Sequence, residues 1–463
     1  MKKLLMIGAA FAAIAGYAGT QAVLRVEPET VVGPIKPVNG VGQPPMIGKL
    51  STWSMMHYLK EAGIPYSRLH DAGGWLGGGL FVDIPNLFRN FAADEKDPAN
   101  YTFAYTDSLI KALVDNGVEP FFRLGGTIEN FVEGGLPPVN TLPPPDAAKW
   151  ARICERVIRH YTEGWANGYK YKIEYWEIWN EPDNQPDAKR NPMWGGDWKS
   201  FCDFYGTVAP YLKAKFPQLK IGGYGSCGFY AAVGSGQVKT ANSTPRLEYF
   251  LDCATNFLAR AKAENWPLDF FSFHSYSEVE EALRQVKYAD ELLTQYGFER
   301  GKTERIFNEW LPEPAPEALG SERQAAAVAA ELIELQKTVC DLACIYDARC
   351  GVGNYSPLFD PSTLKPRPAY KAFLLFNELR KLGTEVKSRS SDPKINILAA
   401  RRGTELAVMV VNYNDKSIPL SVEVRGFEPV EPLPKTIEAF GIKLFHFRVI
   451  AKPYTGGKIR YDA

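Results

Sequence analysis

Hydrophobic residues along the chain follow two patterns, helical spacing and short apolar runs. The helical spacing is clearest at positions i, i+3, i+4, i+7, i+8 and i+11, filled by Trp150, Ile153, Cys154, Val157, Ile158 and Tyr161. Eight apolar runs rich in β-branched and aromatic residues alternate with helical stretches; they are residues 38–41, 64–69, 118–124, 173–179, 219–224, 268–273, 305–308 and 342–346. This alternation predicts an α/β fold, a (β/α)8 TIM barrel.

The pattern changes at about residue 383. From there the runs have a period of two residues, short turns separate them, and no helix fits between them; they are residues 395–400, 405–412, 418–424 and 442–449. They predict a small β-sandwich as an accessory C-terminal domain. A further isolated strand, residues 23–32, stands ahead of the barrel.

The first residues have the composition of an export signal. Met1-Lys2-Lys3 precedes an apolar run that ends near Ala18, and cleavage after Ala18 or Ala22 fits the small residues there. The run is short for a membrane span, and no other stretch is long and apolar enough to cross a bilayer. We therefore expect a signal peptide over residues 1–22 and an exported, periplasmic or secreted protein.

Charge and composition exclude several classes of partner. The chain has 53 basic and 53 acidic residues in 463, and no basic block, which argues against nucleic acid. Five scattered His and no His/Cys ligand spacing predict no metal site, and nothing indicates a cofactor. The seven Cys are expected to be mostly small buried hydrophobes rather than disulfides.

Two carboxylates follow buried runs at corresponding places. Asn180 and Glu181 come directly after residues 173–179, and Pro182 prevents further strand pairing. Glu309 closes the run of residues 305–308 in the same way. The carboxyl ends of barrel strands are the usual place for chemistry, and the fourth and seventh strands face each other there. Their tips can bring two carboxyl groups about 5 Å apart.

These motifs resemble the retaining glycoside hydrolases of clan A. In that clan the acid/base Glu follows an Asn at the end of strand 4, and the nucleophile Glu ends strand 7. Within the clan the chain looks most like glycoside hydrolase family 39, the β-xylosidase and α-L-iduronidase family. Further stretches that resemble its strands are residues 35–41, 68–71 and 271–276.

The resemblance implies a role for each site residue. Glu181 would be the acid/base and Glu309 the nucleophile, and Asn180 would hydrogen-bond the sugar 2-hydroxyl. Tyr276 would orient Glu309. The subsite for the non-reducing end of the sugar would be lined by Arg68, His70 and His274.

The two carboxyl groups need pKa values that differ. We expect burial by Trp179 and the charge of Glu309 to raise the pKa of Glu181. Hydrogen bonds from Tyr276 and Arg68 should keep Glu309 ionised.

The chain departs from the clan at strand 8, where many members have a Trp. Here the sequence is Tyr346-Asp347-Ala348-Arg349. Tyr346 would serve as the platform for the sugar, with Asp347 or Arg349 reaching the substrate. Arg349 would either bind a uronic acid carboxylate or pair with Asp347. Trp75, in a Gly-rich loop, is either a second platform or part of a loop without ligand contact.

The resemblance also implies a domain division. A strand at residues 23–34 would join the C-terminal β-sandwich of residues 381–463, and residues 35–380 would form the catalytic barrel. The implied activity is a retaining exo-glycosidase, β-xylosidase-like, that uses two Glu in a double displacement on oligo- or polysaccharides. The alternatives are an endo-acting glycanase on the same barrel and a non-catalytic carbohydrate-binding protein. Both carboxylates are present, which argues against the latter. Neither the sugar nor the oligomeric state follows from these motifs.

Overall fold

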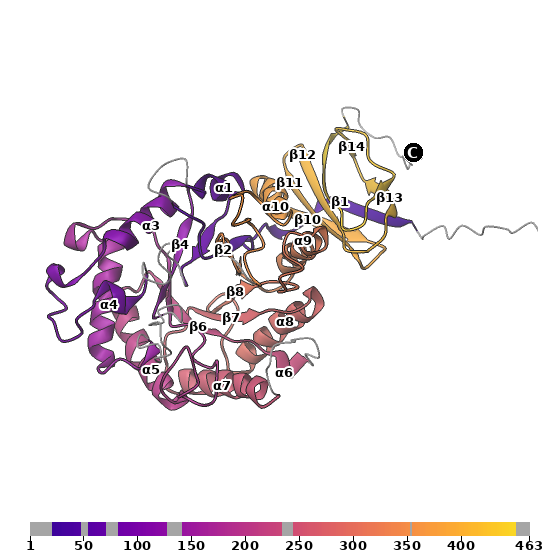
Figure 1. Ribbon diagram of the computed structural model, residues 1–463. Helices are drawn as coiled ribbons and strands as arrows, with labels where there is room; N and C mark the ends of the chain where they lie inside the picture. The colour runs from indigo at the N-terminus through magenta and orange to yellow at the C-terminus, as the bar shows by residue number, and fades with distance from the viewer. Residues whose placement is uncertain are drawn as a thin grey trace, which may run out of the picture.

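A closed parallel barrel makes up most of the computed structural model, which describes residues 21–47, 54–70, 82–126, 141–233, 244–351 and 354–450. Its strands follow one another in chain order around the barrel (Figure 1). They are β2 (Gly40–Gly42), β3 (Tyr66–Arg68), β4 (Glu119–Leu124), β5 (Tyr175–Ile178), β6 (Lys220–Ser226), β7 (Phe270–Ser275), β8 (Glu304–Trp310) and β9 (Leu342–Ile345). The predicted TIM barrel is confirmed.

Helices connect successive strands and cover the outside of the barrel. The α-helices are α1 (Met56–Glu61), α2 (Ile84–Leu87), α3 (Ala104–Asp115), α4 (Ala147–Thr162), α5 (Trp198–Lys215), α6 (Tyr230–Val233), α7 (Thr244–Ala263), α8 (Val279–Gln295), α9 (Glu322–Lys337) and α10 (Tyr370–Leu382). Two short 3-10 helices are η2 (Pro98–Asn100) and η4 (Trp165–Asn167). The amphipathic stretch predicted at residues 150–161 lies in α4, where Asp146 caps the helix by accepting a hydrogen bond from the Lys149 backbone N–H.

Alternate residues of each barrel strand point into the barrel and out toward the helices. In β5, Trp176 and Ile178 join the core beneath the helices, whereas Tyr175 packs inside the barrel. One layer of the barrel interior is therefore apolar. It is formed by Tyr66, Phe121, Tyr175, Phe270, Ile306, Leu342 and Cys344.

Two residues further along five of these strands, the barrel interior becomes polar. These positions are occupied by Arg68, Arg123, Glu177, Ser272 and Asn308, each at most 1% exposed. The polar layer lies directly below the carboxyl ends of the strands, where TIM barrels carry their active sites.

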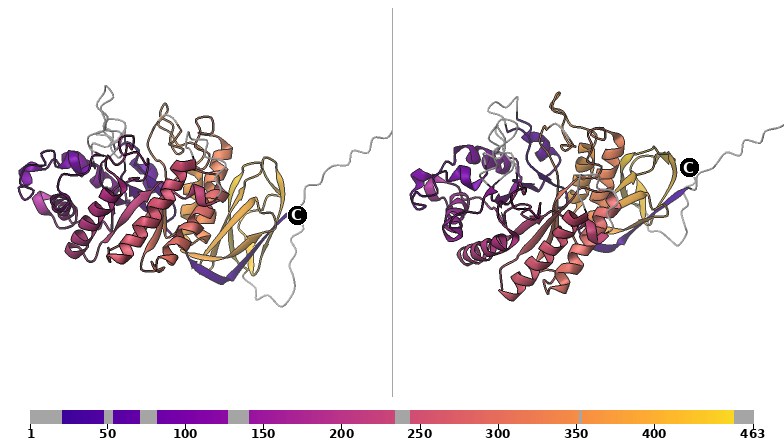
Figure 2. Two further views of the ribbon diagram at one scale, coloured as in Figure 1. Left: turned by 90° about the horizontal axis from the view of Figure 1, so that it is seen from below. Right: turned by 60° about the horizontal axis from the view of Figure 1, so that its bottom comes forward.

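The C-terminal region is an eight-stranded sheet with the order β14-β16-β12-β11-β10-β1-β13-β15. The strands are β1 (Ala22–Pro34), β10 (Thr384–Ser390), β11 (Ile395–Arg402), β12 (Glu405–Asn412), β13 (Ile418–Val424), β14 (Phe427–Pro429), β15 (Thr436–Ile437) and β16 (Ile442–Val449). The N-terminal strand β1 pairs antiparallel with β10 and parallel with β13, and Figure 2 shows it running along the C-terminal strands.

The sheet closes over its own core, as a β-sandwich does, and also packs on the barrel. Leu420 of β13, Phe427 of β14 and Phe445 of β16 share that core, although they come from opposite ends of the sheet. In β12, alternate residues beginning at Leu406 face this core, and those beginning at Ala407 join the core of the barrel, next to α9 and α10. The predicted fold class, a barrel with an accessory β-sandwich, is thus confirmed.

Three strands of the sheet were absent from the sequence prediction: β10, β14 and β15. β10 reads Thr-Glu-Val-Lys-Ser-Arg-Ser, and only Glu385 and Val386 are buried in it, so it carries no apolar alternation. Its backbone pairing to β1 and β11, which holds it in the sheet, leaves no mark in the hydrophobic pattern.

The structure also bears on two expectations from composition. All seven cysteines, each among the described residues, are unpaired, and six of them are buried. In the part of the chain that the structure describes, no helix has both the length and the apolar character needed to cross a bilayer. The expected signal peptide falls on residues 1–22, of which 1–20 lie outside the described residues.

Candidate active site

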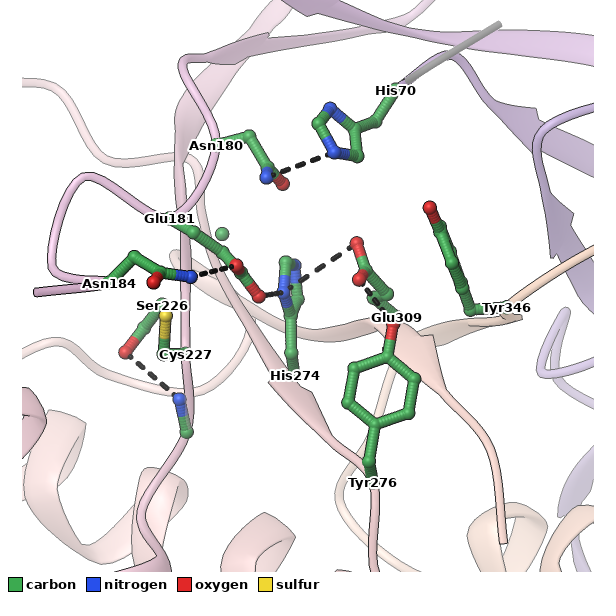
Figure 3. Close-up of polar contacts among 12 residues, drawn as sticks. His70, Asn180, Glu181, Asn184, Ser226, Cys227, His274, Tyr276, Glu309 and Tyr346 are labelled. Atoms are coloured by element: carbon green, nitrogen blue, oxygen red, sulfur yellow. Dashed lines mark hydrogen bonds and ion pairs between the residues drawn. The ribbon is translucent and has the colours of Figure 1, made fainter. Parts of the chain in front are cut away.

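Glu181 and Glu309 meet at the carboxyl end of the barrel, together with His274 (Figure 3). The His274 Nδ1 atom lies 2.7 Å from Glu181 Oε1 and 3.6 Å from Glu309 Oε2. A ligand atom of each of the three side chains lies within 4.8 Å of the others. The predicted pair of carboxylates is therefore adjacent in space, with an imidazole beside both.

A bulge in β8 sets the direction of Glu309. Phe273 of β7 pairs with Phe307, but the next residue, His274, pairs with Glu309, so Asn308 is an extra residue in β8. Without the bulge, strand alternation would send neighbouring residues to opposite faces. With it, Asn308 and Glu309 both reach groups inside the barrel.

Glu309 is held by two donors that the sequence analysis expected. Arg68 Nη1 donates to Glu309 Oε2 at 2.9 Å, and the Tyr276 hydroxyl donates to Oε1. Burial and the negative charge of Glu181 raise the pKa of Glu309 above its ordinary value, against the opposing effect of His274, Arg68 and Tyr276. Its carboxylate is thus oriented by donors at both oxygens and made more basic by its surroundings.

Glu181 has different partners and the opposite shift. His274 faces its Oε1 atom, and Asn184 Nδ2 donates to Oε2 at 2.8 Å. Burial tends to raise the pKa of Glu181, but the hydrogen bond and positive charge of His274, with the Asn184 bond, bring it below its ordinary value. The sequence expectation of a raised pKa is wrong for the unliganded protein, because it did not include His274.

Trp179 does not cover Glu181 as expected. Its indole N–H donates to the Met193 carbonyl at 2.7 Å, and its ring packs edge-on against Trp194 and Phe204. These rings belong to the core between barrel and helices. The residue that flanks the Asn-Glu motif is therefore a packing residue.

The carboxylates around His274 favour its protonated form. His274 is fully buried, which lowers its pKa, yet the negative charges of Glu309 and Glu181 raise that pKa above the ordinary value. An imidazolium next to both carboxylates stabilises their ionised forms. The 2.7 Å contact between His274 Nδ1 and Glu181 Oε1 is short enough for a proton to pass between them.

Arg68, Asn180 and His70 form a chain of contacts beside Glu309. Arg68 Nη2 donates to Asn180 Oδ1, and Asn180 Nδ2 lies 3.2 Å from His70 Nε2. All three are at most 4% exposed. Burial and the positive charges of Arg123 and Arg68 lower the pKa of His70 well below its ordinary value, so this imidazole is neutral.

The residues after β9 form an aromatic group beside Glu309. Tyr346 accepts a hydrogen bond from Gln43 Nε2 at 2.6 Å, and its ring lies edge-on to Tyr276 and Tyr355. The Arg349 Nε atom lies 2.9 Å from Asp347 Oδ2, so the pairing alternative for Arg349 is the one observed. Trp75 lies outside the described residues.

Comparison with known proteins agrees with this geometry. Residues 48–317, more than half of the chain, match glycosyl hydrolases family 39. The chain belongs to this family. It is therefore a glycoside hydrolase with a carbohydrate substrate, and the resemblance drawn from its motifs is confirmed.

Individual relatives are distant in sequence but similar over most of their length. A β-xylosidase from Caldicellulosiruptor saccharolyticus is 24% identical over 401 residues, which cover 78% of this chain and 72% of the relative. A glucosidase from Croceicoccus marinus has a TM-score of 0.67 at 21% identity, covering 93% of this chain and 84% of the other. A family 39 glycoside hydrolase from Bacteroides cellulosilyticus WH2 has a TM-score of 0.58 at 14% identity, covering 90% and 81%.

Several residues of this family 39 site were not found from the sequence. Glu177 had a detectable signal, because strand alternation places it on the same face as Tyr175, inside the barrel. Gly225 had none. It has φ of +66°, and a Cβ there would lie 3.1 Å from Arg68 Nη2 and 3.2 Å from Asn180 Oδ1. Only glycine allows β6 this close to the site.

The three central side chains also have the chemistry of metal ligands. Among the described residues, Glu181, His274 and Glu309 each offer one ligand atom. Two carboxylates and an imidazole suit a divalent cation such as Zn²⁺. The same oxygens are those that would meet the anomeric centre of a bound sugar, so this group does not require a metal to explain its arrangement.

Asp183, two residues beyond Glu181, should make stability depend on pH. It is fully buried and accepts hydrogen bonds from Ser226 Oγ and the Cys227 backbone N–H. Burial, together with the charge of Glu181, raises its pKa from 3.8 to about 7. Between these two values only the folded state binds this proton, so stability should fall as pH rises through that window.

The substitution Asp183→Asn should remove this dependence, since the amide oxygen still accepts both hydrogen bonds and does not titrate. We expect the variant to match the wild type near pH 4 and to unfold a few degrees higher at pH 8, for a difference of roughly 2–4 kcal/mol. Calorimetric scans of both proteins across this range test the prediction. Parallel pH profiles for variant and wild type would contradict it.

Proposed function

We propose that this family 39 hydrolase is a retaining exo-glycosidase of the β-xylosidase type. The observation that supports the retaining mechanism is the approach of the Glu181 and Glu309 oxygens within 4.8 Å. Retaining enzymes place their carboxyl groups about 5–5.5 Å apart, whereas inverting enzymes leave about 6.5–9.5 Å for a water molecule. The different partners of the two carboxylates support different roles.

In the first step Glu309 attacks the anomeric carbon, and the bond to the leaving oxygen breaks. Arg68 and Tyr276 hold the attacking carboxylate in a fixed direction. The leaving oxygen takes its proton from Glu181, to which His274 Nδ1, 2.7 Å away, can pass one. The product is a glycosyl ester on Glu309 and a free alcohol.

In the second step Glu181 changes its role from proton donor to proton acceptor. Esterification removes the negative charge of Glu309. Of the two carboxylates beside His274, Glu181 is then the one that is still anionic. Glu181 accepts a proton from water, the water oxygen bonds to the anomeric carbon, and Glu309 leaves as a carboxylate. Two displacements restore the original configuration.

The exo mode and the sugar rest on the relatives. The relative from Caldicellulosiruptor saccharolyticus is a β-xylosidase, and a glucosidase is among the similar structures. Both names describe removal of a single sugar residue. We therefore propose xylose-configured substrates cleaved from the non-reducing end.

Hydrolysis of nitrophenyl glycosides tests this function. Among β-D-xyloside, α-L-arabinofuranoside and β-D-galactoside, we expect the xyloside to be cleaved best. Proton NMR should show the β-anomer of xylose as the first product. An α-anomer would exclude the retaining mechanism, and mid-sized oligomers as first products from xylan would show an endo mode instead.

A further inference from the structure

Glu177 lies at the centre of the polar layer beneath the site. It is fully buried in β5 and accepts three hydrogen bonds from three other strands. Arg68 Nε of β3 donates at 2.8 Å, Ser272 Oγ of β7 at 2.6 Å, and Asn308 Nδ2 of β8 at 2.7 Å. Its carboxylate thus ties together the strands that carry the catalytic groups.

We propose that Glu177 is a positioning residue, the permanent counter-ion that holds Arg68 in place throughout the catalytic cycle. The inference rests on the proposed retaining mechanism, because the need for a second counter-ion arises only when Glu309 becomes an ester. Glu177 acts through Arg68 and does not touch the substrate.

The geometry of Arg68 explains how Glu177 reaches the site. Its guanidinium is planar and rigid, and each of its nitrogens has a separate acceptor. Nε donates to Glu177, Nη1 to Glu309 and Nη2 to Asn180. Any rotation that follows loss of the Glu177 bond would displace the donors to both other side chains together.

The charge balance explains why two carboxylates surround one arginine. Arg68 is 1% exposed, and a buried cation without a counter-ion is strongly unfavourable. In the free enzyme both Glu177 and Glu309 pair with it. In the glycosyl-enzyme intermediate Glu309 is a neutral ester, and Glu177 still balances Arg68. The covalent intermediate can therefore form without leaving an unpaired buried charge.

Other groups around this centre do not replace Glu177. Glu309 is also faced by His274 and Tyr276, which are donors, and by Glu181 across the site. The Cys344 thiol of β9 lies near Arg68 and Glu177, but burial raises its pKa and keeps it neutral. Among these neighbours, only Glu177 offers Arg68 a negative charge that the reaction leaves unchanged.

Trapping of the intermediate in Glu177→Gln tests the proposal. The probe is 2,4-dinitrophenyl 2-deoxy-2-fluoro-β-D-xyloside, whose good leaving group needs no proton, and intact-protein mass follows its covalent attachment. We expect labelling of the wild type at Glu309, and labelling on the order of 100-fold slower in Glu177→Gln, since a small misplacement of reacting groups has effects of that size.

A matched control removes a carboxylate from the other end of the barrel. Glu304 begins β8, pairs with Lys220 and accepts a hydrogen bond from Tyr175, and none of its contacts among the described residues is with the site. Glu304→Gln should be labelled at the wild-type rate. If Glu177→Gln does not fold, Glu177→Asp, which keeps the charge but withdraws it by one methylene, should still label at least tenfold more slowly than the wild type.

The acidic limb of the pH profile of kcat/KM is a second readout, and a merely structural role of Glu177 would not move it. In Glu177→Gln, displacement of Arg68 weakens the donor and positive charge that lower the pKa of Glu309, so this pKa should rise and the limb should shift to higher pH. An unlabelled wild type would overturn the proposed function, and this inference with it. The inference alone would be overturned if the wild type is labelled, Glu177→Gln is labelled equally fast and the acidic limb does not move. If Glu177→Gln does not fold, the same comparison applies to Glu177→Asp.

Discussion

Glu309→Ala should abolish turnover of every glycoside, with a loss of roughly four or more powers of ten in kcat. The reason is that Glu309 forms the bond to the anomeric carbon in the proposed mechanism, so even a substrate with an excellent leaving group needs it. Arg68 and Tyr276, which hold this carboxylate, would then orient nothing. The measurement is steady-state hydrolysis of dinitrophenyl and nitrophenyl xylosides.

Two controls separate loss of the nucleophile from loss of the fold. Glu304→Ala, in the same strand but at the opposite end of the barrel, should keep most of the activity. Azide should enter the space left in Glu309→Ala and give a glycosyl azide of inverted configuration. Retained configuration from this variant, or unchanged activity, would show that Glu309 is not the nucleophile.

Glu181→Ala should lose activity in a manner that depends on the leaving group. Dinitrophenol needs no proton, so the first step should proceed nearly normally and release a burst of product, after which the enzyme stalls as the covalent intermediate. For substrates with poor leaving groups, loss of general acid catalysis should slow the first step by about 10²–10⁴-fold. Stopped-flow absorbance with both kinds of substrate measures the difference.

The surroundings of Glu181 give this variant a specific rescue. His274 and Asn184 both face the Glu181 carboxylate, and in Glu181→Ala they would line a cavity suited to a small anion. Added azide should bind there, attack the intermediate and restore turnover with retained configuration. Equal loss on all leaving groups, without azide rescue, would contradict the assignment of Glu181 as acid/base.

The sequence contained most of the fold and the identity of the two carboxylates. The barrel was predictable because most of its strands lie largely within short apolar runs and α4 has a strongly amphipathic pattern. Glu181 and Glu309 stood out because a charged residue directly after a buried run needs a reason to be there. β10 escaped prediction because backbone hydrogen bonds, rather than buried side chains, hold it in the sheet.

The tertiary structure decided the electrostatics of the site. His274 was recognised as a site residue, but its position beside both carboxylates depends on how β7 pairs with β8 across the bulge at Asn308. That placement lowers the pKa of Glu181, whereas the sequence analysis expected this pKa to be raised. Trp179, expected to cover Glu181, packs instead among other rings outside the barrel.

By itself the chain determined most of the strands and helices, and which carboxylates end the buried runs, because hydrophobic periodicity and proline or glycine placement act locally. The folded barrel decided which partner each charge receives. Arg68 and Glu177 are 109 positions apart in the chain, and Arg68 and Glu309 are 241 apart, yet each pair is in hydrogen-bond contact. Since pKa values and orientation depend on such neighbours within a few ångströms, only closure of the barrel determines them.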